Sequence, residues 1–101
     1  MKKAMILAAA AALLAPAAAM AERTGEEVYN TKCSVCHAAG IAGAPTVGKA
    51  DEWAPRAEKG IDALLATAKS GLNAMPPMGT CMDCSDAELK GAIQYMLDNS
   101  K

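Results

Sequence analysis

Apolar side chains recur at spacings of three and four residues in two stretches of the chain. Such spacing places them on one face of an α-helix. The first stripe consists of Ile61, Leu64, Leu65 and Ala68, and the second of Leu89, Ile93, Met96 and Leu97. No segment alternates apolar and polar residues as a half-buried strand does. The pattern therefore predicts an all-α fold of about four short helices.

Two capping boxes indicate where helices begin. In Thr24-Gly25-Glu26-Glu27, the Thr24 hydroxyl can accept the Glu27 amide while the Glu27 carboxylate accepts the Thr24 amide. We expect a helix from Gly25 toward Cys36. Ser85-Asp86-Ala87-Glu88 repeats the arrangement ahead of the second apolar stripe and predicts the start of the last helix.

Glycine and proline interrupt the chain between these two helices. Asp51 is expected to cap a short helix, with Pro55 in its first turn, where a missing amide costs nothing. Gly71 is expected to stop the helix of the first stripe. The predicted segments are a loop over residues 38–50, helices over 51–59 and 61–72, and a constrained loop over 74–84 that contains Pro76, Pro77 and two cysteines.

The N-terminal segment has the features of an export signal. Two lysines precede an alanine-rich apolar stretch, and Ala19-Met20-Ala21 is a pattern that signal peptidase accepts. This predicts a cleaved signal peptide over residues 1–21 and one domain over residues 22–101, located in the periplasm. The alternative is a retained membrane anchor, which needs about 20 consecutive apolar residues. Pro16 and Glu22 cut the stretch short.

The charge of the domain and the composition of its core argue against some classes of function and favour others. Outside the expected leader, eight basic residues face 11 acidic ones, which gives a net charge of −3. The absence of a basic run argues against nucleic-acid binding, and the negative charge favours a basic surface on a partner. The chain has no Phe, one Trp and two Tyr. A small domain with so few large side chains needs a disulfide, a metal or a cofactor to stabilise it.

Cys33-Ser34-Val35-Cys36-His37 is the strongest chemical signal, because C-x-x-C-H is the attachment sequence of c-type haem. Cysteines three residues apart project from one face of a helix, so both thiols can form thioethers with one porphyrin. His37 follows directly and can give its imidazole to the iron. The sequence thus predicts one covalent haem c on Cys33 and Cys36, with His37 as the proximal ligand.

Other kinds of cysteine site remain open at this point. A thioredoxin-type dithiol requires a preceding strand, and none is predicted. Cys81 and Cys84 form a second C-x-x-C pair, as in a zinc ribbon, but 44 residues separate the pairs where about 15–20 are expected. A non-haem structural protein with a framework of disulfides is the third possibility.

The sequence also limits the second axial ligand. His37 is the only histidine, so ligation by two histidines of this chain is excluded. Methionine is the usual partner of histidine in cytochromes c. Met96 belongs to the second apolar stripe, where a core role is expected. We expect Met75 to be the ligand, because Pro76-Pro77 restricts the chain after it; Met78 is the alternative.

The motifs C-S-V-C-H, A-M-P-P-M-G and C-M-D-C-S-D occur in this order, and from Val28 to Leu97 the chain resembles the cytochrome c5 family of class I cytochromes c. The resemblance implies short helices wrapped around one haem. It implies that Cys33, Cys36, His37 and Met75 hold the haem, that the Pro45 carbonyl accepts the other imidazole N–H, that Trp53 and Arg56 lie near the haem propionates, and that Cys81 and Cys84 form a disulfide. Met78 is a departure, because the family often has lysine there.

The same resemblance implies a periplasmic electron carrier and not an enzyme, since protein ligands on both sides of the iron leave no position for a substrate. The expected partners are transient redox proteins: a terminal oxidase or periplasmic reductases, and donor cytochromes or a quinol-oxidising complex. No nucleic acid and no stable membrane insertion after leader cleavage are expected. The alternative function is a haem sensor or a small peroxidase-like enzyme in which the distal methionine dissociates.

Overall fold

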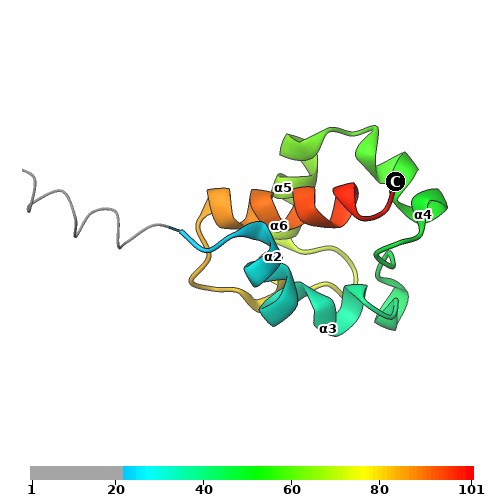
Figure 1. Cartoon of the computed structure of the whole chain (residues 1–101). Helices are drawn as coiled ribbons and strands as arrows, with labels where there is room; N and C mark the ends of the chain where they lie inside the picture. The colour runs from blue at the N-terminus through cyan, green and yellow to red at the C-terminus, as the bar shows by residue number, and fades with distance from the viewer. Residues whose placement is uncertain (1–21) are drawn as a thin grey trace, which may run out of the picture.

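The computed structural model describes residues 22–101, and the expected leader over residues 1–21 lies outside them. The helical elements are α2 (Gly25–Val28), the π-helical turn η1 (Tyr29–Cys33), α3 (Ser34–His37), α4 (Ala50–Ala57), α5 (Ile61–Ser70) and α6 (Asp86–Asp98), with 3₁₀ turns η2 (Ile41–Gly43) and η3 (Pro77–Thr80) (Figure 1). Within residues 22–101 no strand forms, and the only β-type pairing is the isolated bridge between Leu72 and Met75. The predicted all-α fold is confirmed. None of the helices in this range is long and apolar enough to cross a bilayer.

The first three elements form one continuous helical segment from Gly25 to His37. The Thr24 capping box is present, as predicted. In the middle, the Ser34 amide donates to the Tyr29 carbonyl, five residues back, so the segment widens into a π turn that ends at Cys33. Such turns are frequent at functional sites.

The first described helix, α2, crosses the last one, α6 (Figure 1). At the crossing, Gly25 and Gly91 bring the two backbones together: a Cβ atom on Gly25 would lie 2.1 Å from the Gly91 carbonyl oxygen. Around it, Val28 is fully buried with Leu89 and Ala92, and the disulfide of Cys81 and Cys84 completes this first core cluster. The absence of a side chain at Gly25 lets the helices approach closely enough for these apolar residues to pack.

Arg23 ties the start of the described chain to α6. Its backbone amide and its Nε both donate to Glu88 Oε2, at 2.9 and 2.7 Å. The hydrogen bond from Arg23, together with that from the Ser85 amide, lowers the pKa of Glu88 to about 2. Glu88 also closes the second predicted capping box, with Ser85, which is confirmed. One carboxylate therefore fixes both the N-terminal segment and the start of α6.

The expected start of α4 is wrong. The helix begins at Ala50 after Lys49, whose carbonyl accepts the amide of Trp53, so Asp51 lies inside the helix and does not cap it. Pro55 falls in the second turn, where its missing amide leaves one carbonyl of the helix without an intrahelical partner. The Glu52 side chain instead fixes the entry to the helix, because its Oε1 accepts the Thr46 amide at 2.8 Å. A contact with the preceding loop replaced the expected local cap.

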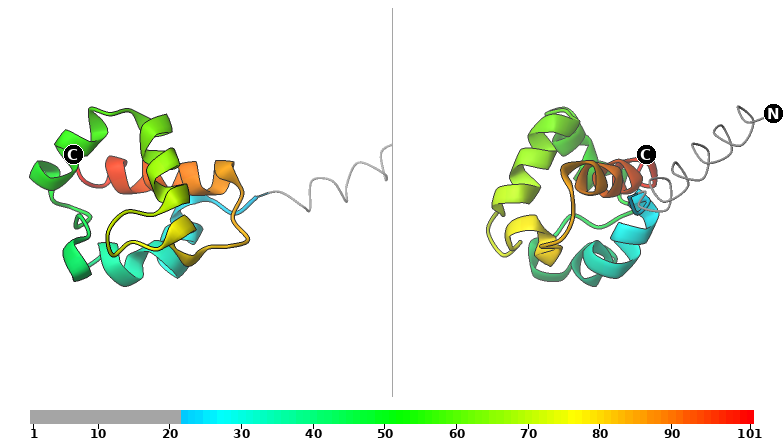
Figure 2. Two further views of the ribbon diagram at one scale, coloured as in Figure 1. Left: turned by 180° about the vertical axis from the view of Figure 1, so that it is seen from behind. Right: turned by 90° about the vertical axis from the view of Figure 1, so that its left-hand side faces the viewer.

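Helix α5 follows its predicted stripe but ends at Ser70, two residues early, since Gly71 has a φ of 85° that stops a right-handed helix. Ala68 is buried, and its stripe neighbours pack on a second core cluster made of Tyr29, Trp53, Ala68, Ile93 and Met96. Both views in Figure 2 show the loop that follows α5, drawn in yellow, between α5 and α3. This arrangement brings the two motif-bearing segments to face each other.

Candidate functional site

A cavity of about 380 Å³ opens between α3, α5, α6 and the two irregular segments over residues 38–49 and 71–85. Its volume lies within the range of about 300–1,000 Å³ usual for ligand pockets. The structure brings all seven residues expected to bind the cofactor to its wall: Cys33, Cys36, His37, Pro45, Trp53, Arg56 and Met75. We refer to this cavity as the crevice.

His37 is the buried polar residue of the crevice wall, with only 8% of its surface exposed. Its Nδ1 lies 2.8 Å from the carbonyl oxygen of Pro45. A carbonyl can only accept a hydrogen bond, so Nδ1 carries the proton and Nε2 keeps a free lone pair. The Trp53 ring, 5.8 Å away between centroids and tilted by 38°, supports the imidazole from the side. This orientation of His37 leaves Nε2 available to a metal.

Cys33 and Cys36 are free thiols and line the same cavity. Their placement follows from the helical segment, on which residues three apart share a face. Cys33 also packs against both core clusters, and its burial raises the pKa of the thiol to about 11. A Cys33 thiol that is not joined to a cofactor would therefore be protonated at neutral pH.

The two candidate methionines pack against different core clusters. Met75 packs against the second core cluster, which contains Trp53, and its terminal methyl lies 3.6 Å from a Cβ atom built on Gly79. Met78 packs against the first cluster beside the disulfide, and its backbone has a φ of 63°. Both line the crevice. Met75 packs against the cluster to which the indole beside His37 belongs, which favours Met75 as the residue facing the imidazole.

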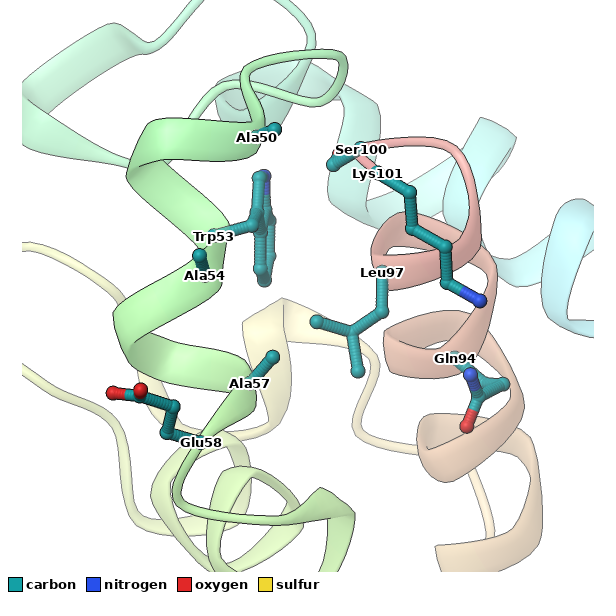
Figure 3. A pocket seen from close by; sticks show the side chains of 9 residues that line it. All are labelled: Ala50, Trp53, Ala54, Ala57, Glu58, Gln94, Leu97, Ser100 and Lys101. Atoms are coloured by element: carbon teal, nitrogen blue, oxygen red, sulfur yellow. The ribbon is translucent and has the colours of Figure 1, made fainter.

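Trp53 and Arg56 both come from α4 and reach the crevice wall. The indole N–H of Trp53 donates to the Thr46 carbonyl at 3.0 Å, so its contribution to the crevice is the face of its ring. Figure 3 shows the same indole from the other side, at a second cavity of about 450 Å³ between α4 and the end of α6. Arg56 donates from Nη1 to the Glu52 carbonyl, which leaves other guanidinium N–H groups for an anion.

The charge at the crevice is opposite to the net charge of the domain. The charged residues of its wall are Lys32, Arg56 and Lys59, all basic. Among residues 22–101 none of these three forms an ion pair, whereas Lys69 and Lys90 pair with carboxylates elsewhere. The crevice wall is therefore basic although the domain is acidic, so the net charge alone does not predict the charge of a partner surface that docks here.

Cys81 and Cys84 are joined by a disulfide, with 5.4 Å between their Cα atoms. The bond lies in the first core cluster, and Arg23 Nη2 approaches Cys84 Sγ at 3.6 Å. The four cysteines thus divide into a free pair at the crevice and a bonded pair away from it. This division leaves no four-cysteine zinc site in the described part of the chain.

The chain matches a family model described as cytochrome C oxidase, cbb3-type, subunit III, over residues 20–96. It is 50% identical over 76 residues to cytochrome c5 of Ectopseudomonas mendocina, with 73% of this chain and 87% of the relative covered. To cytochrome c5 of Azotobacter vinelandii it is 53% identical over 76 residues, with coverages of 73% and 92%. The chain belongs to the cytochrome c5 family.

Solved structures of cytochromes c share the fold of this chain. A cytochrome c from a crystal structure described as an electron transfer complex of nitrite reductase with cytochrome c is similar with a TM-score of 0.74 and 45% identity, over 76% of this chain and 94% of that one. A mono-haem ferrocytochrome c from Shewanella putrefaciens has a TM-score of 0.70 and 46% identity, over 80% and 99%. As a member of this family, the protein is an electron carrier with one covalently bound haem c, and it is not an enzyme.

The donor set of the crevice fits the haem of a cytochrome c5. Two thiols three residues apart can form the thioethers, a buried imidazole presents Nε2, and a thioether comes from the loop after α5. Sequence reasoning missed Thr46, whose carbonyl holds Trp53, and the close approach of Gly71 to the methionine loop. Neither leaves a local signal, because each contact joins segments that the fold brings together.

Proposed function

We propose that this protein carries one electron at a time in the periplasm, after cleavage of residues 1–21, on a haem attached to Cys33 and Cys36 with His37 and Met75 as axial ligands. The observation that carries the proposal is the convergence of these four side chains on one cavity, from the helical segment and from the loop after α5. When bound, the haem supplies an iron that gains and loses one electron.

The residues of the chain prepare the site for that exchange. Pro45 fixes the tautomer of His37, so the imidazole need not reorient when the charge on the iron changes. Met75 as the opposite ligand favours the reduced state and raises the potential. With both axial positions filled, no coordination site is left for peroxide or oxygen. Arg56 is positioned to neutralise a propionate, while Trp53 packs its ring against the cavity.

The rim of the crevice supports brief docking to redox partners. Val35, Ile41 and Leu72 are 69%, 54% and 58% exposed, large apolar side chains that line the cavity mouth. Apolar contacts beside Lys32 and Lys59, which pair with no carboxylate among residues 22–101, suit a small, transient interface with an acidic partner surface. One similar cytochrome c was solved in an electron transfer complex with nitrite reductase. We therefore propose periplasmic reductases or a terminal oxidase as acceptors, and donor cytochromes or a quinol-oxidising complex as donors.

Two matched variants test the ligand assignment. In Met75→Ala, the long-wavelength sulfur-to-iron band of the oxidised protein should vanish and cyanide should bind rapidly. In Met78→Ala, the band and slow cyanide binding should persist, because Met78 packs beside the disulfide. The opposite result would assign the ligand to Met78. A wild-type protein with no such band and an open iron would replace electron carriage by the sensor or peroxidase-like function.

A further inference from the structure

The end of α5 lies directly against the loop that carries Met75. The Gly71 amide donates to the Thr67 carbonyl at 2.8 Å and closes the helix. The next residue, Leu72, exchanges two backbone hydrogen bonds with Met75, at 3.0 and 2.9 Å. The loop therefore turns back onto the helix end within four residues.

Position 71 has no room for a side chain. A Cβ atom built on Gly71 would lie 2.8 Å from the Met75 carbonyl oxygen, 3.0 Å from Pro77 N and 3.2 Å from the carbonyl carbon of Pro76. All three are backbone atoms, which cannot rotate away as a side chain can. Ordinary contact begins at 3.4 Å, so an added methyl group must push the loop outward by several tenths of an ångström.

We propose that Gly71 is a positioning residue for the axial ligand: it lets the backbone of residues 75–77 rest on the end of α5 and thereby sets the reach of the Met75 thioether. The inference rests on the proposed ligand role of Met75. Metal–ligand distances in a well-defined site are held within about 0.2 Å. The displacement that a methyl group at position 71 imposes exceeds this tolerance.

The helix can serve as a fixed reference because its inner face is packed. Ala68 is buried, and Leu64 and Leu65 pack on the second core cluster, so the end of α5 does not yield when the loop is pushed. The loop is stiffened as well, since Pro76-Pro77 follows Met75 and the Pro76 carbonyl accepts the Gly79 amide at 3.0 Å. A push at position 71 is therefore transmitted to Met75.

Helix α5 itself offers a matched control. Gly60 at its start has φ 89° and ψ 154°, and Gly71 at its end has φ 85° and ψ 162°. This backbone region is almost restricted to glycine, so alanine strains both positions alike. A Cβ atom on Gly60, however, meets nothing within 4 Å. The two alanine variants thus share the backbone strain and differ in the contact with the methionine loop.

The test compares Gly71→Ala with Gly60→Ala in the haem-loaded protein. In Gly71→Ala we expect the sulfur-to-iron band to shift or weaken, the midpoint potential to fall, and cyanide binding to become about tenfold faster, as strain favours departure of Met75. In Gly60→Ala the band, the potential and the cyanide rate should remain those of the wild type. Unchanged values in Gly71→Ala would overturn the inference, and so would equal changes in both variants.

If Gly71→Ala does not fold, amide hydrogen exchange of the wild-type protein tests the role of Gly71 instead. The Leu72 and Met75 amides should exchange much more slowly than that of Ala74, because both donate in the bridge against the helix end. Equally fast exchange would overturn the inference. Failure of the ligand proposal itself looks different: the wild type and Gly60→Ala would also lack the band if no methionine binds the iron, and Met75→Ala would keep the band if Met78 is the ligand.

Discussion

Two glycines touch each other where α2 crosses α6, and we expect alanine substitutions at these two positions to have opposite effects on stability. In Gly25→Ala the new methyl group would lie 2.1 Å from the Gly91 carbonyl oxygen, a backbone atom, so the helices must separate. In Gly91→Ala the new methyl group would lie 3.4 Å from the Gly25 Cα atom, which is ordinary contact. The contact is therefore asymmetric, although both residues lie in the same crossing.

The magnitudes follow from that geometry. Overpacking costs about 1–3 kcal/mol, and the clash in Gly25→Ala should reach the upper end because no rotamer relieves it. For a domain of this size, that corresponds to a fall in melting temperature of about 10–20 °C. In Gly91→Ala, replacing a glycine inside a helix gains about 0.5–1 kcal/mol, so the protein should be as stable as the wild type or slightly more stable.

Thermal and denaturant unfolding of both haem-loaded variants, followed by circular dichroism, measures the difference. The reasoning predicts a large loss for Gly25→Ala alone. Equal losses in the two variants would refute the geometry of the crossing. A Gly25→Ala variant as stable as the wild type would show that the helices can separate at no cost.

Three further changes test other parts of the structure. The pKa of Glu88 in the folded protein is about 2, below the usual 4.5, so its contribution to stability is present above pH 4.5 and is lost as the pH falls through about 2. Arg23→Gln should therefore unfold more easily than the wild type at pH 7. Unfolding curves should show this difference in stability decreasing toward pH 2. Replacing Cys81 and Cys84 by Ser should lower the melting temperature but leave haem attachment intact, and loss of the covalent haem would contradict the division of the cysteines. Lys32→Glu should slow electron transfer to an acidic redox partner at low ionic strength and lose its effect at high salt; a rate independent of salt would show that the crevice cations do not steer docking.

Local patterns predicted the parts of the fold that depend on neighbours in sequence. Both capping boxes form, because the partners lie three residues apart and need only a helix start. The stripe of α5 faces the core as its period requires. The C-x-x-C-H motif predicted that both thiols and the imidazole bind the same haem. In the structure all three side chains line the crevice.

Such local patterns could not predict contacts between segments that are far apart in the sequence. Arg23 has no sequence signal that identifies its partner, yet it reaches Glu88 across 65 residues. The start of α4 depends on Glu52 accepting the Thr46 amide, which competes with capping by Asp51. The distribution of charge also depends on the fold, because a net charge of −3 gave no sign that the crevice wall is basic.

The mass of the peptide that contains Cys33, Cys36 and His37 tests the central claim most directly. The protein should be produced by cells that assemble c-type cytochromes, exported, extracted with acidified organic solvent and digested. The account predicts that this peptide retains the mass of one haem through both sulfurs. A bare peptide, with the pigment released into the solvent or absent from the start, would contradict it.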